Sequence, residues 1–109
     1  MQILLTAATP FEIAPTLKWL REKFSLKEEG VFEKNGLAVF PLITGVGSVA
    51  TAFHLGQFFA NNRPDLALNA GIAGAFDKKL ALGDVLNVTT ECFGDLGVEE
   101  ADGRFTDLF

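Results

Sequence analysis

Residues 65–75 constrain the fold most, because a short apolar run ends there in small residues that include Gly71 and Gly74. Pro64 cannot donate a hydrogen bond to a neighbouring strand, so the run begins after it, and its nearly continuous apolar character suits a strand covered on both faces. We predict a central parallel strand over 65–71. Its glycines allow a sharp turn and a close approach to another molecule at the carboxyl end, where open α/β sheets bind ligands. The same glycines also suit a turn that only reverses the chain.

The amino-terminal residues predict a second interior strand and a helix. Residues 2–8 have the length and apolar composition of a buried strand, which we expect beside 65–71. Thr9-Pro10-Phe11-Glu12 has the form of a capping box, in which Thr9 caps a helix and the Glu12 side chain bonds back to the Thr9 amide. We predict that this helix runs to about Phe24 and that its apolar face holds Ile13, Leu17 and Leu20.

The next residues indicate a hairpin followed by a second helix. Lys34-Asn35-Gly36 suits the turn between strands 31–32 and 37–40, and residues 41–44 extend the second strand toward Gly45-Val46-Gly47. Ser48 suits the N-cap of a helix that ends near residues 61–62. Because apolar residues occupy almost every side of this helix, we expect it to be buried on more than one side. A homo-oligomer interface would account for the apolar residues beyond those that one buried face needs.

Beyond the glycine turn the chain changes character. Residues 82–84 suit a turn into a β-branched strand over 85–90. Residues 93–103 are rich in glycine and acidic residues without helical or strand periodicity, so we expect a loop there. Strands that alternate with helices predict an α/β fold.

Composition and charge narrow the class of protein. With 109 residues, of which 49% are hydrophobic, the chain is long enough for one domain with a real core. A net charge of −5 without any cluster of Lys and Arg argues against nucleic acid or an anionic membrane as a partner. A single cysteine, Cys92, and a start without a signal-peptide pattern favour the cytoplasm, and no apolar run reaches the length of a membrane span.

Several kinds of site find no support in the sequence. His54 and Cys92 are the only soft metal ligands and neither has a partner at metal-site spacing, so we expect no metal site and a structural role for His54. Gly45-Val46-Gly47 lacks the third glycine of a dinucleotide fingerprint, and no Walker lysine is present, so we expect no nucleotide cofactor. Neither a nucleophile elbow nor an oriented Ser-His or Cys-His pair is visible.

The candidate catalytic groups that remain are carboxylates near the glycine turns, and Glu12 is the best placed of them. Pro15 makes the first helical turn irregular, which can free Glu12 from capping and let it face the bend near Ile72. A carboxylate beside an apolar pocket has a raised pKa and can act as a general base on water. The competing interpretation is that Glu12 only caps the helix. Less well placed are Glu91, Asp95, Glu99 and Asp102.

In their order and spacing, four segments resemble the nucleoside phosphorylase and nucleosidase superfamily. They are Ile3 to Glu12, Thr44-Gly45-Val46-Gly47 before an apolar helix, Pro64 through Gly74, and Leu82-Gly83-Asp84-Val85. The chain is most similar to the hydrolytic branch, which includes methylthioadenosine/adenosylhomocysteine nucleosidase and futalosine hydrolase. This resemblance implies a three-layer α/β sandwich with a mixed, phosphorylase-like central sheet, and a homodimer built partly on the helix over 48–61.

The resemblance also implies roles for single residues. Glu12 matches the carboxylate that activates the attacking water, and Ala8 with Thr9 matches a segment that lines the ribose site. Val46 falls where the family contacts the 5′ substituent of the sugar, and Ile72-Ala73-Gly74 matches the turn that meets ribose and base. The implied reaction breaks the bond between C1′ and the base nitrogen through an oxocarbenium-like sugar, which water held by Glu12 then attacks.

Departures from the family pattern refine the expected reaction. Thr6-Ala7-Ala8 and Asn69 stand where the phosphorylases carry phosphate-binding arginines, which favours water over phosphate as the acceptor. Ile72 replaces the serine of adenosine-type nucleosidases. Together with Phe93-Gly94-Asp95-Leu96-Gly97 and the acidic loop after it, this favours hydrolysis of futalosine to dehypoxanthine futalosine and hypoxanthine in menaquinone biosynthesis.

The family continues well beyond Phe109 and supplies from there a carboxylate that holds the ribose hydroxyls and an aspartate that protonates the leaving purine. We therefore expect residues 1–109 to be the N-terminal part of a single nucleosidase-like domain, without turnover on their own. Three other interpretations stay open: a methylthioadenosine or adenosylhomocysteine nucleosidase, a non-catalytic nucleoside-binding or dimerisation module, and a generic α/β domain without a ligand.

Overall fold

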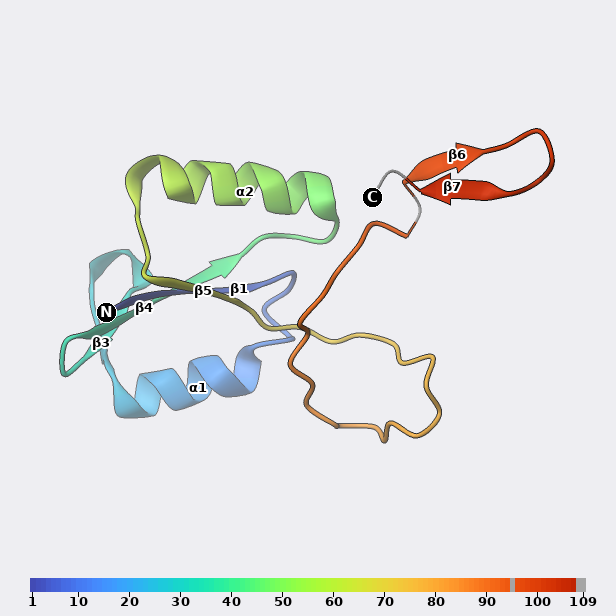
Figure 1. Cartoon of the computed structure of the whole chain (residues 1–109). Coiled ribbons are helices and arrows are strands. Elements are labelled where there is room, and N and C mark those ends of the chain that lie inside the picture. Colours follow the sequence, from blue (N-terminus) through green and yellow to red (C-terminus); the bar gives the residue numbers. More distant parts are fainter. Residues whose placement is uncertain (95, 108–109) are drawn as a thin grey trace. The chain divides into compact units, whose positions relative to one another are not determined.

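The chain divides into two compact units, Met1–Gly74 and Ala75–Phe109, and the structure, a computed structural model, describes residues 1–94 and 96–107. The first unit holds two α-helices and a five-stranded mixed sheet in the order β2-β3-β4-β1-β5 (Figure 1). The second unit holds the two-stranded sheet of β6 and β7. The predicted mixed α/β class is confirmed.

The strands of the first unit are β1 (Gln2–Ala7), β2 (Ser25–Leu26), β3 (Phe32–Lys34), β4 (Leu37–Ile43) and β5 (Leu66–Asn69). β1 lies between β4 and β5 and runs parallel to both, with Leu5 opposite Pro41 and Leu68. β3 pairs antiparallel with both β2 and β4. The first predicted strand and its place beside the run after Pro64 are therefore confirmed.

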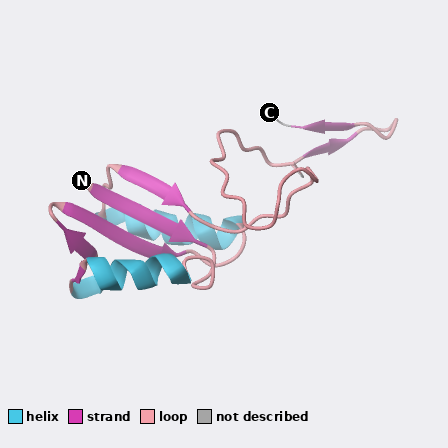
Figure 2. Cartoon of the chain, turned by 90° about the horizontal axis from the view of Figure 1, so that it is seen from below, coloured by secondary structure: helices cyan, strands magenta, loops and turns pink. Residues whose placement is uncertain are grey.

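The helices α1 (Ala14–Lys23) and α2 (Ser48–Asn61) lie on opposite sides of this sheet, as Figure 1 shows, and Figure 2 shows the strands running between them. A short 3-10 turn, η1 (Glu28–Gly30), follows β2. The helix over residues 48–61 is confirmed, although Gly47 with φ 93° is its N-cap instead of the predicted Ser48.

α1 begins later than the capping box predicts. Its N-cap is Ile13, which makes no side-chain cap, and residues 10–13 form turns outside the regular helix. Pro15 accounts for this, because a proline lacks the N–H that an interior helical position must donate and is tolerated only in the first turn. The prediction of Thr9 as the helix N-cap is therefore wrong.

The apolar core of the first unit forms around α1 and the neighbouring strands. Its buried residues are Leu5, Ala7, Ile13, Leu20, Phe32 and Val39, and Leu17 packs against them. The predicted face of α1 is thus confirmed. Leu4 is completely buried, and successive strand residues point to opposite faces, so it points away from this cluster. Its register partner Phe40 meets Phe58 of α2, with 5.8 Å between the ring centroids.

Two predictions about strands in the second half of the chain are wrong. Within the described residues β5 pairs only with β1, and its Leu66 and Leu68 are 44% and 45% exposed, so β1 is the interior parallel strand and β5 an edge strand. Residues 85–90 form no strand, and hence no neighbour covers the second edge of β5 in the described chain. In the single chain α2 has no buried residue, and both Val49 and Phe53 are exposed. Burial of this helix in a homo-oligomer interface stays a prediction.

The antiparallel hairpins β3–β4 and β6–β7 differ in how well the sequence predicts them. Asn35 and Gly36 have φ of 49° and 78°, the left-handed conformations that a two-residue hairpin turn requires, which confirms the predicted turn. Within residues 93–103, predicted as a loop, β6 (Gly97–Glu99) is a strand that forms a hairpin with β7 (Phe105–Asp107), so the loop prediction is wrong for 97–99. A Cβ at Gly97 would clash with the Thr106 carbonyl oxygen, so this pairing needs glycine there. In the described chain no helix has the length and apolar character of a membrane span.

Candidate functional site

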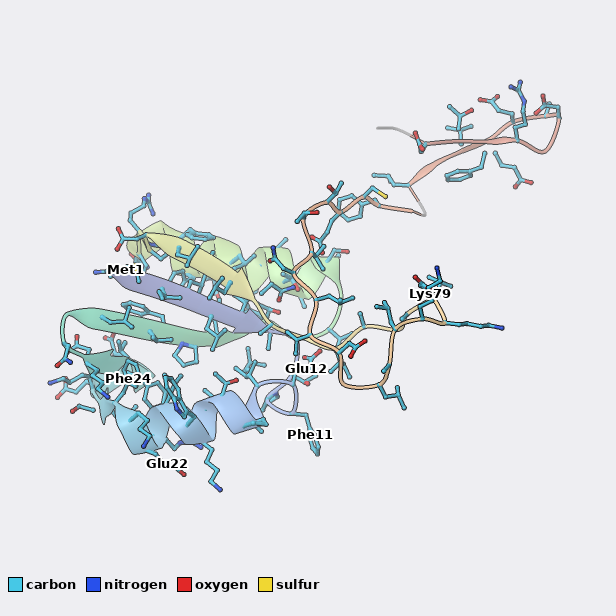
Figure 3. The ribbon with its side chains drawn as sticks, turned by 60° about the horizontal axis from the view of Figure 1, so that its bottom comes forward. Met1, Phe11, Glu12, Glu22, Phe24 and Lys79 are labelled. Carbon is cyan, nitrogen blue, oxygen red and sulfur yellow. The ribbon has the colours of Figure 1, made fainter. Side chains whose placement is uncertain are left out.

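Glu12 lies at the carboxyl end of the sheet, in the turn between β1 and α1 (Figure 3). Its Oε2 accepts a hydrogen bond from the Thr9 backbone N–H at 2.7 Å and another from the Thr9 hydroxyl at 3.1 Å. Its Oε1 accepts a longer hydrogen bond, of 3.4 Å, from the Ile72 backbone N–H. The carboxylate therefore connects the end of β1 with the bend after β5, and Glu12 faces that bend as the sequence predicts.

The parallel pairing of β1 and β5 brings these segments together. The Ala70 N–H donates to the Thr6 carbonyl oxygen at 2.8 Å, so the chain leaves β5 beside the end of β1. Gly71 then passes so close to the carboxylate that a Cβ on it would lie 3.2 Å from Glu12 Oε1. Gly71 was not among the predicted site residues. A glycine at the carboxyl end of a parallel strand is the signal that points to it.

Hydrogen bonds set the charge state of Glu12. The bond from the Thr9 backbone N–H, above all, holds the pKa of the Glu12 carboxyl below its ordinary value, against an opposing effect of desolvation, and the bonds from Ile72 and the Thr9 hydroxyl add to the lowering. Neither ion pair formed by the described residues includes Glu12. The predicted rise in pKa is therefore wrong, because donors surround the side chain where the sequence suggested an apolar pocket.

Thr44, which directly follows β4, forms hydrogen bonds with the end of β1 at the carboxyl edge of the sheet, where Glu12 lies. Its backbone N–H and its hydroxyl donate to the Ala7 carbonyl oxygen at 2.9 and 3.3 Å, and the Thr51 hydroxyl of α2 donates to the Thr44 hydroxyl at 3.3 Å. Val46 therefore follows β4 at the edge where Glu12 lies, and its side chain is 79% exposed. Sequence reasoning missed Thr44 as an organising residue, although a polar residue that ends an apolar strand is a usable signal.

The predicted site residues fall into two groups. Those that donate hydrogen bonds to the Glu12 carboxylate are Thr9 and Ile72, and the Ala8 backbone makes a smaller contribution to the lowered pKa of Glu12. Those that are exposed and take no part in these hydrogen bonds are Val46, Ala73 and Gly74. Phe11 precedes Glu12 directly but is 93% exposed and projects away from the sheet (Figure 3).

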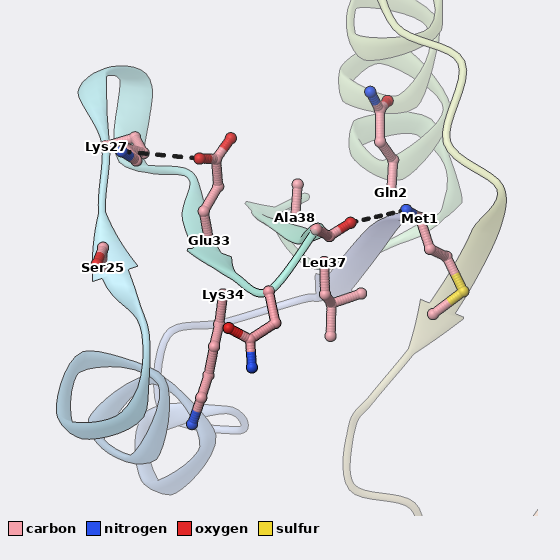
Figure 4. Close-up of a pocket in the computed structure, with 10 residues that line it drawn as sticks. Met1, Gln2, Ser25, Lys27, Glu33, Lys34, Leu37 and Ala38 are labelled. Atoms are coloured by element: carbon pink, nitrogen blue, oxygen red, sulfur yellow. Dashed lines mark hydrogen bonds and ion pairs between the residues drawn. The ribbon is translucent and has the colours of Figure 1, made fainter.

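A cavity of about 420 Å³ lies away from Glu12, at the amino ends of β1 and β4 (Figure 4). Its cationic groups already have partners. The Lys27 ammonium lies 3.8 Å from the Glu33 carboxylate, the Met1 ammonium donates to a carbonyl in the β3–β4 turn, and Lys34 Nζ lies 5.7 Å from the centroid of the Phe24 ring. Because these cations are engaged, this cavity is a weaker candidate site than the carboxyl edge of the sheet.

The remaining polar candidates do not form a second site. Among residues 1–94 and 96–107, no three His, Cys, Asp or Glu side chains gather as a metal site would require. His54 makes an edge contact with Phe53, 5.4 Å between ring centroids, and Cys92 is exposed. Asp102 accepts hydrogen bonds from the Arg104 N–H and guanidinium, which lower the pKa of its carboxyl. Asp95 lies outside the described residues.

No protein-family model matches the chain, and no solved structure matches it significantly. The functional interpretation therefore depends on the geometry around Glu12 together with the resemblance of the four sequence segments.

Proposed function

We propose that this chain is the N-terminal part of a cytoplasmic purine nucleosidase of the nucleoside phosphorylase superfamily. The whole protein hydrolyses futalosine to dehypoxanthine futalosine and hypoxanthine. The observation that supports this most is the Glu12 carboxylate, held by Thr9 and turned to the Ile72 N–H at the carboxyl edge of the parallel strands. The parallel β4-β1-β5 core between two helices is compatible with the three-layer phosphorylase-like sandwich that the proposal requires.

In the proposed reaction the bond between C1′ of the ribose and the purine nitrogen breaks, and its electron pair leaves with the purine. The sugar becomes an oxocarbenium-like cation, which the ionised Glu12 stabilises while it orients a water molecule toward C1′. As the new C–O bond forms, one water proton passes to Glu12. The purine takes up a proton from the acid that the resemblance assigns to residues beyond Phe109.

The lowered pKa of Glu12 fits an electrostatic role better than a strongly basic one. A carboxylate with a depressed pKa stays ionised at neutral pH but takes a proton only weakly in the ground state. An oxocarbenium-like cation is reactive enough to need little activation of water, and it gains from a fixed negative charge nearby. We therefore assign Glu12 to charge stabilisation and water orientation first, and to proton acceptance as the water attacks.

The neighbouring strand ends favour water over phosphate as the acceptor. Where the phosphorylases carry arginines, the Thr6 hydroxyl lies 3.2 Å from Asn69 Oδ1 and 3.3 Å from the Leu68 carbonyl oxygen. These neutral groups satisfy one another and supply no positive charge for a phosphate dianion. Hydrolysis is the reaction that such an environment supports.

We also propose that two copies associate through α2. This helix carries no Asp, Glu, Lys or Arg, and none of its residues is buried in the single chain. Val49 and Phe53 are large apolar residues that remain exposed on it. Because the helix is uncharged, two copies can meet there without repulsion despite the net charge of −5.

The test is hypoxanthine release from futalosine by the full-length protein and its Glu12→Gln variant. Glu12→Gln should lose at least about 100-fold in kcat. The matched control Glu22→Gln, which changes an exposed carboxylate of α1, should keep wild-type turnover. Wild-type turnover in Glu12→Gln would remove Glu12 from the mechanism. Parallel assays with methylthioadenosine and adenosylhomocysteine identify the substrate, and calorimetric binding of a nucleoside without any hydrolysis would favour a non-catalytic module.

A further inference from the structure

The two oxygens of the Glu12 carboxylate have different surroundings. Oε2 receives two hydrogen bonds from one residue, Thr9, at 2.7 and 3.1 Å. From residues 1–94 and 96–107, Oε1 receives only the 3.4 Å bond from the Ile72 N–H, which is longer than the usual range for such bonds. Oε2 is thus the anchored atom, and Oε1 keeps the capacity to bind a further donor such as water.

Helix capping does not explain the bonds between Thr9 and Glu12. In a capping box the threonine occupies the N-cap and the glutamate lies in the first helical turn. Here the N-cap is Ile13 and α1 starts at Ala14, so both Thr9 and Glu12 precede the helix. Their hydrogen bonds close a turn outside the helix and fix where the carboxylate points.

We propose that Thr9 is a positioning residue of the Glu12 site: its N–H and hydroxyl hold Oε2, so that Oε1 stays turned toward the Ile72 amide. The sequence resemblance gives Thr9 a place in the ribose lining only. The consequence for turnover rests on the proposed function, whereas the effect of Thr9 on Glu12 itself does not.

The test compares Thr9→Val with Thr9→Ser. Valine replaces the hydroxyl by a methyl group of similar volume and keeps the backbone N–H, while serine keeps both donors. In the 109-residue chain, a ¹³C NMR titration of the Glu12 carboxyl carbon should show a higher pKa in Thr9→Val than in the wild type, because one donor to the charged form is lost. Thr9→Ser should titrate like the wild type. Thr9→Ala, which also lacks the hydroxyl, should repeat the valine result and serves where the valine variant does not fold.

In the full-length protein, Thr9→Val should lower kcat on the order of tenfold, because the carboxylate loses one of the two donors that hold Oε2. The acid limb of its pH–rate profile should move to higher pH, and Thr9→Ser should restore both properties. An unchanged Glu12 titration in Thr9→Val and Thr9→Ala refutes the positioning role even if nucleosidase activity is present. A raised Glu12 pKa in a protein without nucleosidase activity supports the positioning role and refutes the proposed function alone.

Discussion

Substituting alanine for Gly71 should displace the Glu12 carboxylate without disturbing the backbone. Gly71 has no positive φ that would exclude alanine, and the new Cβ would lie 3.2 Å from Glu12 Oε1 and 3.8 Å from its Cδ. Gly74 supplies a matched control, because it also has no positive φ and a Cβ on it meets nothing within 4 Å. The two substitutions therefore add the same methyl group, with and without a clash at the carboxylate.

The size of the effect follows from the distances. A 3.2 Å approach is tighter than an ordinary contact, so the carboxylate must retreat by a few tenths of an ångström. The hydrogen bond from the Ile72 N–H already measures 3.4 Å, and a retreat of this size breaks it. Loss of that donor raises the pKa of Glu12, and the displaced carboxylate should lower kcat on the order of tenfold, since misplacement by about 1 Å costs about 100-fold.

The assay is hypoxanthine release by the full-length protein across a range of pH. Gly71→Ala should show a lower kcat and an acid limb displaced to higher pH, because Glu12 must be ionised to act and is protonated more readily in the variant. Gly74→Ala should keep the wild-type acid limb, because its methyl group does not approach the Glu12 carboxylate. Equal acid limbs in the two variants would mean that close approach at Gly71 does not control Glu12.

Three further predictions concern stability and assembly. Leu4→Ala should lower the free energy of unfolding by about 2–5 kcal/mol in urea denaturation, since Leu4 is fully buried, whereas Leu82→Ala at a fully exposed position should change it by less than about 0.5 kcal/mol. Phe53→Lys should convert the homodimer into a monomer in analytical ultracentrifugation. Phe76→Lys, at another exposed aromatic position, should leave the dimer intact. A monomeric wild type would contradict the α2 interface. Ionised Glu12 stabilises the fold at pH values above its ordinary pKa of 4.5, and this contribution disappears as the pH falls through the lower pKa of the folded state. The free energy of unfolding should therefore fall less between neutral and acid pH in Glu12→Gln than in the wild type. Urea denaturation at both pH values measures this difference.

Local patterns predicted those parts of the fold that local forces determine. Asn35-Gly36 specifies its turn through the left-handed conformations that the two residues accept. The bounds of α2 followed from a glycine turn before it and polar residues after it. In each case the signal and the structure involve neighbouring residues.

Some predictions that required knowledge of distant partners were wrong. The apolar run of 65–71 indicated burial on both faces, but burial depends on which segments lie beside it, and within the described chain only β1 pairs with β5. The hairpin of β6 and β7 was missed because three residues per strand are too few to show an alternating pattern. Its stability depends on pairing across a turn, which sequence periodicity does not report.

The candidate site shows how a correct contact can arise from an incorrect reason. The spacing of Thr9 and Glu12 predicted their hydrogen bond as part of a helix cap, and the bond exists although the helix starts only at Ala14. Pro15 moves the helix start, and Gly71 leaves room for the freed carboxylate to reach the bend after β5. The direction of the Glu12 pKa shift then depends on backbone N–H donors, and the order of residue types along the chain does not show where these donors lie. A threonine and a glutamate at capping spacing therefore bring the carboxylate to the bend after β5 only together with a feature that displaces the helix start and a glycine that leaves room for the side chain, and both are present here.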